Sequence, residues 1–201
     1  MIVGLLLAAG GARRFGSQKL VAPLDGVPIV RRAFDSLAAA TDAVLVVVGS
    51  ESEAVARALE GSAAILFEHR DWASGLSTSI RAGIFAMPRR AEAVIVGLGD
   101  EPTIDAAVCR ELVRVWRGGE KLIVAARYNG VQDHPVLFDR AVFDELTSLE
   151  GDVGAKSVIN RVPERVAFVD VSAPQPIDVD EPGDMPEARG QMPDNSDSGF
   201  M

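Results

Sequence analysis

The sequence predicts an α/β fold, a Rossmann-like three-layer α/β/α arrangement around a mostly parallel central sheet. Two observations predict it. Short apolar runs without polar alternation recur along the chain, and such runs are typical of strands that are buried on both faces. Segments with amphipathic helical spacing lie between these runs, and strand–helix–strand repetition gives βαβ units whose strands are parallel.

The apolar runs follow one another along most of the chain. The first is followed by two glycines, and the run at 93–98 is followed by Gly99-Asp100. The expected strands are residues 2–7, 43–48, 63–67, 93–98, 122–126 and 165–171, with a shorter strand at 135–138. Residues spaced for one helical face separate several of these strands. These faces comprise Ile29, Ala33, Leu37 and Ala40; Leu76, Ile80, Ile84 and Met87; and Val108, Leu112 and Val115.

The length of 201 residues is that of one domain with a sizeable core. We expect a single domain over residues 1–187. Within it, 131–161 is less regular and is interpreted as an insertion that carries the short strand and two helices. Residues 188–201 are rich in Pro, Asp, Ser and Gly and lack periodicity, which predicts a flexible tail.

Composition excludes several partners and sites. A net charge of −9 repels nucleic-acid backbones and anionic membranes, so we expect neither as a partner. Cys109 is the only cysteine and the chain has two histidines, which argues against a disulfide, a Cys-based zinc site and a His-rich metal site. The N-terminal apolar run is short and has no basic region before it, and no stretch reaches transmembrane length. We therefore expect a cytoplasmic protein.

A glycine-rich loop at residues 7–19 follows the first expected strand, at the sheet edge where open parallel sheets bind ligands. Small residues let backbone N–H groups approach phosphate oxygens, and Arg14 and Lys19 add cationic donors. The loop is not a Walker A motif, because Ser17-Gln18 follow Gly16, and the Gly-x-Gly-x-x-Gly fingerprint is absent. The alternative is a plain strand-to-helix turn with exposed basic residues.

Carboxylates follow two of the later apolar runs. Asp100 comes directly after the run at 93–98, and alternation places Asp178 and Asp180 on one face of a short strand. Mg²⁺ that carries a triphosphate needs one or two carboxylates from a protein. The alternatives are a turn that begins at Asp100 and a solvated strand end. We expect Asp184 to be an acid in the first turn of a helix that starts near Pro182.

The loop resembles a motif of a known family. It resembles the signature Leu-Ala-Ala-Gly-x-Ser-x-Arg-Met-Gly-x-x-Lys of MobA-like nucleotidyltransferases, and within them the MocA-type molybdenum cofactor cytidylyltransferases. Ala12 replaces the usual Ser and Phe15 the usual Met. The segment with Asp100 resembles Gly-Asp-Gln-Pro or Gly-Asp-Met-Pro, with Glu101 in place of Gln or Met. Residues 178–184 resemble Asp-Ile-Asp-Thr-Pro-Glu-Asp.

Three further segments resemble the same family. Residues 74–83 resemble Gly-Met-Ser-x-Ser-Leu-x-x-Gly, with helix capping as the alternative role of their hydroxyls. His134 lies in a match to Gly-His-Pro-Val-x-Phe in which Asp133 replaces Gly, and a structural histidine is the alternative. Lys156 replaces Arg in a match to Gly-Asp-x-Gly-Ala-Arg, and it keeps the charge without the bidentate fork. The matches run in order from Leu5 to about Asp184.

The resemblance implies the fold of the nucleotide-diphospho-sugar transferases and an Mg²⁺-dependent transfer of CMP from CTP to molybdopterin, with a molybdoenzyme as a further partner. Ala9, where guanylyl-type members carry Gly, narrows the pocket and favours a pyrimidine. The residues implied are catalytic Lys19, Arg14 and Asp100; nucleotide-binding Leu7, Ala8, Ala9, Gly10, Gly11, Lys19, Ser77 and Ser79; metal-binding Asp100, Asp180 and Asp178; and acceptor-binding His134 and Lys156, the last two on the 131–161 insertion.

Three other functions stay open at this point. The first is transfer of guanylyl or another nucleotide to a different phosphorylated metabolite. The second is a non-catalytic protein that delivers a nucleotide or the finished cofactor to a molybdoenzyme. The third is a redox enzyme built on this fold, although the chain lacks a dinucleotide fingerprint.

Overall fold

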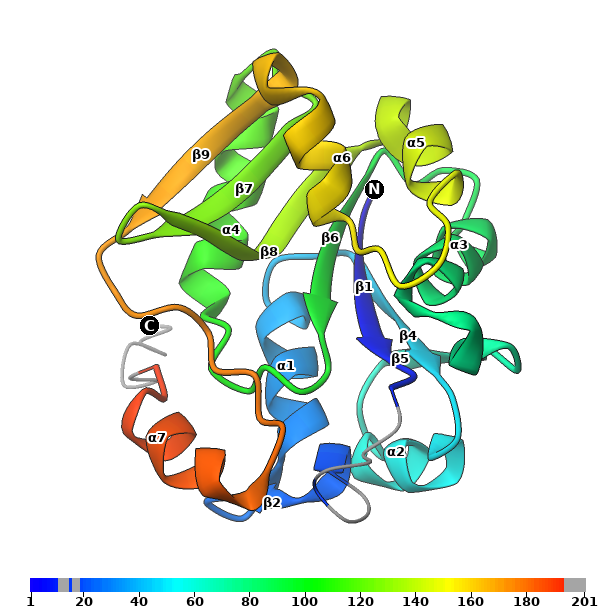
Figure 1. The fold of residues 1–201 in the computed structure, drawn as a ribbon, viewed down its shortest axis with the longest axis vertical. Helices are drawn as coiled ribbons and strands as arrows, with labels where there is room; N and C mark the ends of the chain where they lie inside the picture. The colour runs from blue at the N-terminus through cyan, green and yellow to red at the C-terminus, as the bar shows by residue number, and fades with distance from the viewer. Residues whose placement is uncertain (11–14, 16–18, 194–201) are drawn as a thin grey trace.

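The computed structural model describes residues 1–10, 15 and 19–193. Its centre is a seven-stranded sheet in the order β5-β4-β1-β6-β8-β7-β9, in which only β8 runs antiparallel to its neighbours. The three-layer, mostly parallel α/β fold expected from the sequence is confirmed (Figure 1). The strands are β1 (Ile2–Ala8), β4 (Ala43–Val48), β5 (Ala64–Glu68), β6 (Ala93–Leu98), β7 (Ile123–Tyr128), β8 (Val131–Asp139) and β9 (Val166–Val171).

Central strands are buried on both faces, as their unbroken apolar runs predict. All seven residues of β1 are buried. Alternate side chains of β1 enter opposite cores, because successive residues of a strand point to opposite faces. Leu5 packs in the core on one face and Leu6 in the core on the other. The edge strand β5 differs, since four of its five residues are exposed.

Helices cover both faces of the sheet. The face that receives Leu6 is covered by α1 (Ile29–Ala38), α2 (Ser52–Ala58) and α4 (Ala106–Gly118). The opposite face is covered by α3 (Leu76–Ala86), α5 (Phe143–Thr147) and α6 (Lys156–Arg161). Asp105 caps α4 by accepting a hydrogen bond from the backbone N–H of Ala107 at 2.7 Å. No helix in the described ranges is long and apolar enough to cross a bilayer.

Short elements complete the chain. A two-stranded hairpin, β2 (Pro23–Leu24) with β3 (Val27–Pro28), precedes α1. The last helix, α7 (Met185–Gly190), lies below the carboxyl ends of the central strands in Figure 1. The 3₁₀ turns are Lys19–Val21, Trp72–Ser74, Arg140–Val142, Pro163–Arg165 and Pro182–Asp184.

The segment 131–161 was expected to be an insertion. Two helices are present there, but β8 is longer than the expected 135–138 strand and lies inside the sheet between β6 and β7. This part of the segment therefore belongs to the core, which periodicity could not indicate because pairing partners are set by tertiary contacts.

Two other expectations near the C-terminus need correction. The short strand expected around Asp178 and Asp180 is wrong, because this stretch runs extended across the strand ends without joining a sheet. The helix α7 continues past the expected domain boundary at 187, and Ala188 is fully buried against Leu24 and Ile29. The rest of the expected tail, 194–201, lies outside the described residues.

Candidate active site

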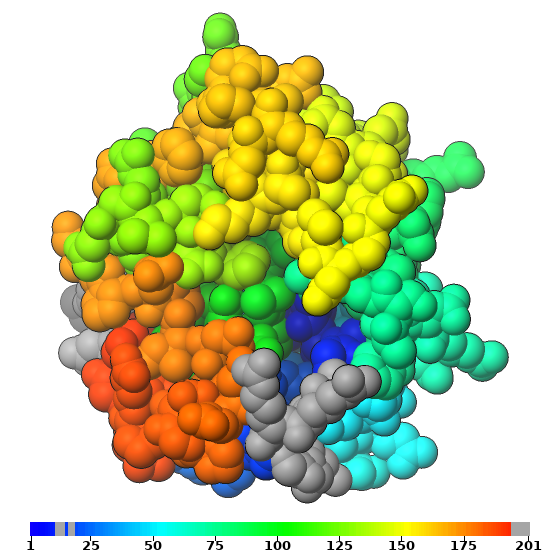
Figure 2. All heavy atoms as spheres, viewed as in Figure 1, coloured from blue at the N-terminus to red at the C-terminus, as the bar shows by residue number. Residues whose placement is uncertain are grey.

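The ends of β1 and β6 and the segment after β9 meet at one edge of the sheet. β1 and β6 pair in parallel with Leu7 opposite Leu98, so the loops that follow them leave side by side. In Figure 1 the orange segment after β9 descends to the left of the end of β6 on its way to α7, and the backbone N–H of Val179 in it donates to the carbonyl of Asp100. Figure 2 shows a hollow in the middle of this face, between the dark blue end of β1, the orange segment and the overhanging yellow residues near 150.

Lys19 and three aspartates converge at this edge. The ammonium Nζ of Lys19 lies 2.7 Å from Oδ2 of Asp100 and 3.0 Å from Oδ1 of Asp180. Asp178 is farther, at 3.9 Å from the same nitrogen. One oxygen from each of the three carboxylates lies within 4.8 Å of the others. The structure thus brings together the four residues that the sequence placed around the metal and the phosphates.

The charges of this cluster shift the pKa values of its members. Burial alone would lower the pKa of Lys19, but attraction and hydrogen bonds from Asp100 and Asp180 outweigh it and raise that pKa. Burial and repulsion from Asp100 raise the pKa of Asp178 to about 7. A single ammonium therefore faces three carboxylates, one of which resists ionisation.

These carboxylates fit a divalent cation. Hard cations such as Mg²⁺ take carboxylate oxygens as ligands, and crowded carboxylates ionise together only when a positive charge compensates them. Asp100, Asp178 and Asp180 can together hold such an ion, because one oxygen from each lies within 4.8 Å of the others.

The segment that carries Asp178 and Asp180 is anchored on both sides. The side chain of Val179 between them is fully buried, and its backbone N–H donates to the carbonyl of Asp100 at 3.0 Å. Asp184 accepts hydrogen bonds at 2.8 Å from the backbone N–H groups of Asp180 and Glu181. Asp184 is thus the acid of a helical first turn, as expected, and it holds Asp180 in place.

The first residues of the loop after β1 pack closely against the residue that follows β4. Leu7, Ala8 and Ala9 are buried, whereas Gly10 is exposed. Gly49, at the end of β4, packs so closely that a Cβ atom there would lie 2.5 Å from the carbonyl oxygen of Ala9. Gly11 and Arg14 of the predicted nucleotide and catalytic sets lie outside the described residues.

Ser77 joins two segments of the chain through a hydrogen bond. It is fully buried, and its hydroxyl donates to the carbonyl of Gly151 at 2.6 Å. Gly75 is required there, because its φ is +110° and a Cβ atom would lie 2.6 Å from the same carbonyl. Ser79 is buried as well. In this structure Ser77 ties the start of α3 to the segment before α6.

His134 lies next to the strand end that carries Asp100. Its Nδ1 is 3.0 Å from Oε1 of Glu101 and 3.6 Å from Oδ1 of Asp133. Burial raises the pKa of Glu101, and the hydrogen bond from His134 only partly offsets this. Burial alone would lower the pKa of His134, but the partner carboxylates outweigh it and raise that pKa. Lys156 is exposed, and its Nζ lies 3.4 Å from the carbonyl of Gln132.

Sequence reasoning missed two members of this group. Glu101 and Asp133 were noted only as departures from the family pattern, yet the structure places both carboxylates against His134. The signal was present in the sequence, since each substitution adds an acid next to a candidate site residue. Distance along the chain hid their contact, because Glu101 and His134 are 33 residues apart.

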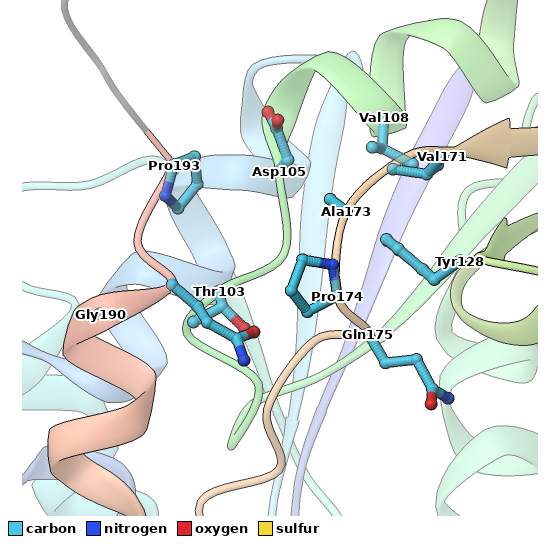
Figure 3. A pocket seen from close by; sticks show the side chains of 11 residues that line it. Thr103, Asp105, Val108, Tyr128, Val171, Ala173, Pro174, Gln175, Gly190 and Pro193 are labelled. Carbon is cyan, nitrogen blue, oxygen red and sulfur yellow. The ribbon is translucent and has the colours of Figure 1, made fainter.

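A separate cavity of about 220 Å³ lies beside the ends of β7 and β9, between α4 and the end of α7 (Figure 3). Thr103, Asp105, Tyr128 and Gln175 are among the residues that line it. None of the site residues expected from the sequence lines this cavity within the described ranges, so it is distinct from the Lys19 cluster.

Comparison with known proteins identifies a family. Residues 4–166 match the MobA-like NTP transferase domain. The chain is 30% identical over 182 residues to nicotine blue oxidoreductase of Paenarthrobacter nicotinovorans, which covers 85% of this chain and 87% of that protein. It is 26% identical to the purine catabolism protein PucB of Bacillus subtilis, over 79% of this chain and 80% of that protein.

A solved structure has the same fold. Rv0371c of Mycobacterium tuberculosis H37Rv superposes with a TM-score of 0.82 at 28% identity, over 94% of this chain and 97% of that chain. A manganese complex of Rv0371c superposes with a TM-score of 0.77 at 27% identity, over 95% of this chain and 99% of that chain. From the match over residues 4–166 and the convergent site, the chain belongs to the MobA-like NTP transferase family and is a nucleotidyltransferase.

Proposed function

We propose that this protein transfers CMP from CTP to the terminal phosphate of a molybdopterin-type acceptor in the cytoplasm, with Mg²⁺ as cofactor and pyrophosphate as the second product. The observation that carries this proposal is the convergence of Lys19 with Asp100 and Asp180 beside the end of β1. An oxygen of the acceptor phosphate attacks the α-phosphorus, and the bond from that phosphorus to the pyrophosphate oxygen breaks.

Each residue of the cluster has a role in this reaction. Asp100 and Asp180, with Asp178, would hold Mg²⁺, which supplies positive charge to the triphosphate when bound. Lys19 and the backbone N–H groups of the loop after β1 stabilise the charge that develops on the leaving pyrophosphate. No protein nucleophile is needed, because alignment and charge neutralisation account for catalysis of phosphoryl transfer. The same stabilising role is proposed for Arg14.

The two substrates are assigned to opposite sides of the hollow. The residues from Leu7 to Gly11, with Ser77 and Ser79, form the proposed nucleotide side, and the methyl group of Ala9 favours a pyrimidine base. His134 and Lys156 form the proposed acceptor side, where an imidazole and an ammonium suit an anionic phosphate. The acceptor-binding role proposed for His134 is supported by the position of this residue beside Glu101, which follows Asp100 in the chain.

Pyrophosphate release with each of the four common nucleoside triphosphates, with and without molybdopterin, tests the proposal. We expect release with CTP and Mg²⁺ only when the acceptor is present. Preference for GTP would change the assigned nucleotide. Tight binding of CTP without pyrophosphate release would support a delivery protein and contradict catalysis.

A second candidate is favoured by one specific observation. The relative with 30% identity is named an oxidoreductase, so a redox activity on this fold deserves a direct test. Oxidation of NADPH, followed by absorbance with nicotine blue as the acceptor, distinguishes the two. Oxidation of NADPH by this protein, without pyrophosphate release from any nucleoside triphosphate, would contradict nucleotide transfer and support the redox activity.

A further inference from the structure

We propose that Glu101, Asp133 and His134 form a second cation site, separate from the Asp100 cluster, that binds a divalent transition-metal ion, Zn²⁺ by preference. The three residues offer two carboxylates and one imidazole, with one ligand atom from each within 4.8 Å of the others. The inference does not rest on nucleotide transfer, because its test needs no nucleotide.

The spacing of the donor atoms fits a small tetrahedral ion. Zn²⁺ binds nitrogen and carboxylate oxygen at about 2.0–2.1 Å, so two such ligands of a tetrahedral ion lie about 3.3 Å apart. Nδ1 of His134 is 3.0 Å from Oε1 of Glu101 and 3.6 Å from Oδ1 of Asp133. These two separations lie on either side of the required value, and the oxygens of Glu101 and Asp133 lie within 4.8 Å of each other.

The charge of Glu101 provides an independent argument. Its side chain is only 5% exposed, and no hydrogen-bond partner for Oε2 exists among the described residues. A buried carboxylate oxygen without a partner is costly, and a second carboxylate beside it adds repulsion. A protonated His134 would still leave two negative charges against one positive charge. A divalent ion compensates both negative charges.

The surroundings of the group resemble an outer shell of a metal site. The Nε2 amide of Gln175 donates to Oδ2 of Asp133 at 2.6 Å, which orients this carboxylate and leaves Oδ1 beside the imidazole. Gln175 also lines the cavity of Figure 3. Outer hydrogen bonds of this kind fix the orientation of metal ligands.

Ligand chemistry separates this site from the Asp100 cluster. Imidazole favours Zn²⁺ and related ions, whereas a set of carboxylates alone suits Mg²⁺. Glu101 and Asp133 also stand where the motifs that the sequence resembles carry Gln or Met and Gly, respectively. These two differences therefore place two carboxylates beside the imidazole of His134.

The test uses Co²⁺, which replaces Zn²⁺ and absorbs visible light when bound tetrahedrally. The metal-free full chain is titrated with Co²⁺ in a large excess of Mg²⁺, which occupies the all-carboxylate cluster. We expect one saturable equivalent with a tetrahedral spectrum. Absence of saturable binding in the wild-type protein would overturn the site and leave Glu101 and His134 as a hydrogen-bonded pair.

Variants assign the ligands. Glu101→Gln and His134→Asn should each weaken Co²⁺ binding by more than the roughly 10–100-fold that loss of an outer partner costs, and Gln175→Ala should weaken it within that range. His69→Asn removes the chain's other histidine and should have no effect. Asp100→Asn should also bind normally. Loss of binding in Asp100→Asn with retention in His134→Asn would assign the ion to the first cluster and refute the proposal.

Discussion

The ammonium of Lys19 lies 2.7 Å from a carboxylate oxygen of Asp100, although the two residues are 81 positions apart in the chain. The same ammonium reaches Asp180, 161 positions away, at 3.0 Å. The side chain of Lys19 therefore links the 3₁₀ turn after this loop to the end of β6 and to the segment before α7.

Replacing Lys19 by Met should lower pyrophosphate release by roughly 100- to 1000-fold, because one preorganised cation for the leaving group is lost. The measurement is initial rate under saturating CTP, acceptor and Mg²⁺. Lys121→Met is the matched control, since that lysine donates to the carbonyl of Glu164, away from the cluster. Wild-type rates in the Lys19 variant would remove this residue from the mechanism.

Replacing Asp100 by Asn should raise the Mg²⁺ concentration needed for half-maximal activity and lower the maximal rate, because a neutral amide is a weaker ligand for a hard dication. The rate is measured across a Mg²⁺ titration. Asp144→Asn, on the exposed side of α5, serves as the control. An unchanged Mg²⁺ dependence in Asp100→Asn would contradict the metal role.

The stability of the metal-free protein should decrease as pH rises from about 4 to about 7. The folded-state pKa of Asp178 is raised to about 7 from an ordinary value of 3.8, so the folded protein binds the proton more tightly than the unfolded chain. Protonated Asp178 therefore contributes its full stability below the unfolded-state pKa of 3.8. This contribution is lost as pH rises through the folded-state pKa of about 7. Urea unfolding at several pH values measures it.

Asp178→Asn should flatten that pH dependence, and saturating Mg²⁺ should restore stability on the alkaline side by binding only the folded state. Ion affinity should rise with pH over the same range, because a ligand carboxylate must be deprotonated. If the free energy of unfolding of Asp178→Asn depended on pH as steeply as that of the wild-type protein, another group would be responsible.

Gly49→Ala should destabilise the fold by about 1–3 kcal/mol, because the added methyl group would lie 2.5 Å from the carbonyl oxygen of Ala9 and 2.8 Å from the ring of Trp72. The free energy of unfolding in urea measures this. Gly118→Ala, at the end of α4 with open space around it, is the control and should be neutral or stabilising. Equal stability of both variants would argue against the close contact.

Several features could be predicted from the sequence because they depend on local pattern. Unbroken apolar runs indicated the parallel strands, and the bounds of β4 and β6 agree with the expected 43–48 and 93–98. The strand ends then located Asp100 and the loop after β1, since ligand-binding loops of such sheets follow the carboxyl ends. Alternation predicted that Asp178 and Asp180 point to the same side of the chain. Their side chains do so in the structure, although the stretch forms no strand.

Tertiary structure alone decided the rest. Only the folded chain shows that β8 lies inside the sheet, that Lys19 contacts carboxylates from two distant segments, and that Glu101 and Asp133 meet at His134. Periodicity describes which face of an element is apolar, but strand order and side-chain contacts arise from packing between elements far apart in the chain. The sequence therefore determined the strands, the position of the loop after β1 and the acids, and packing determined which of them meet.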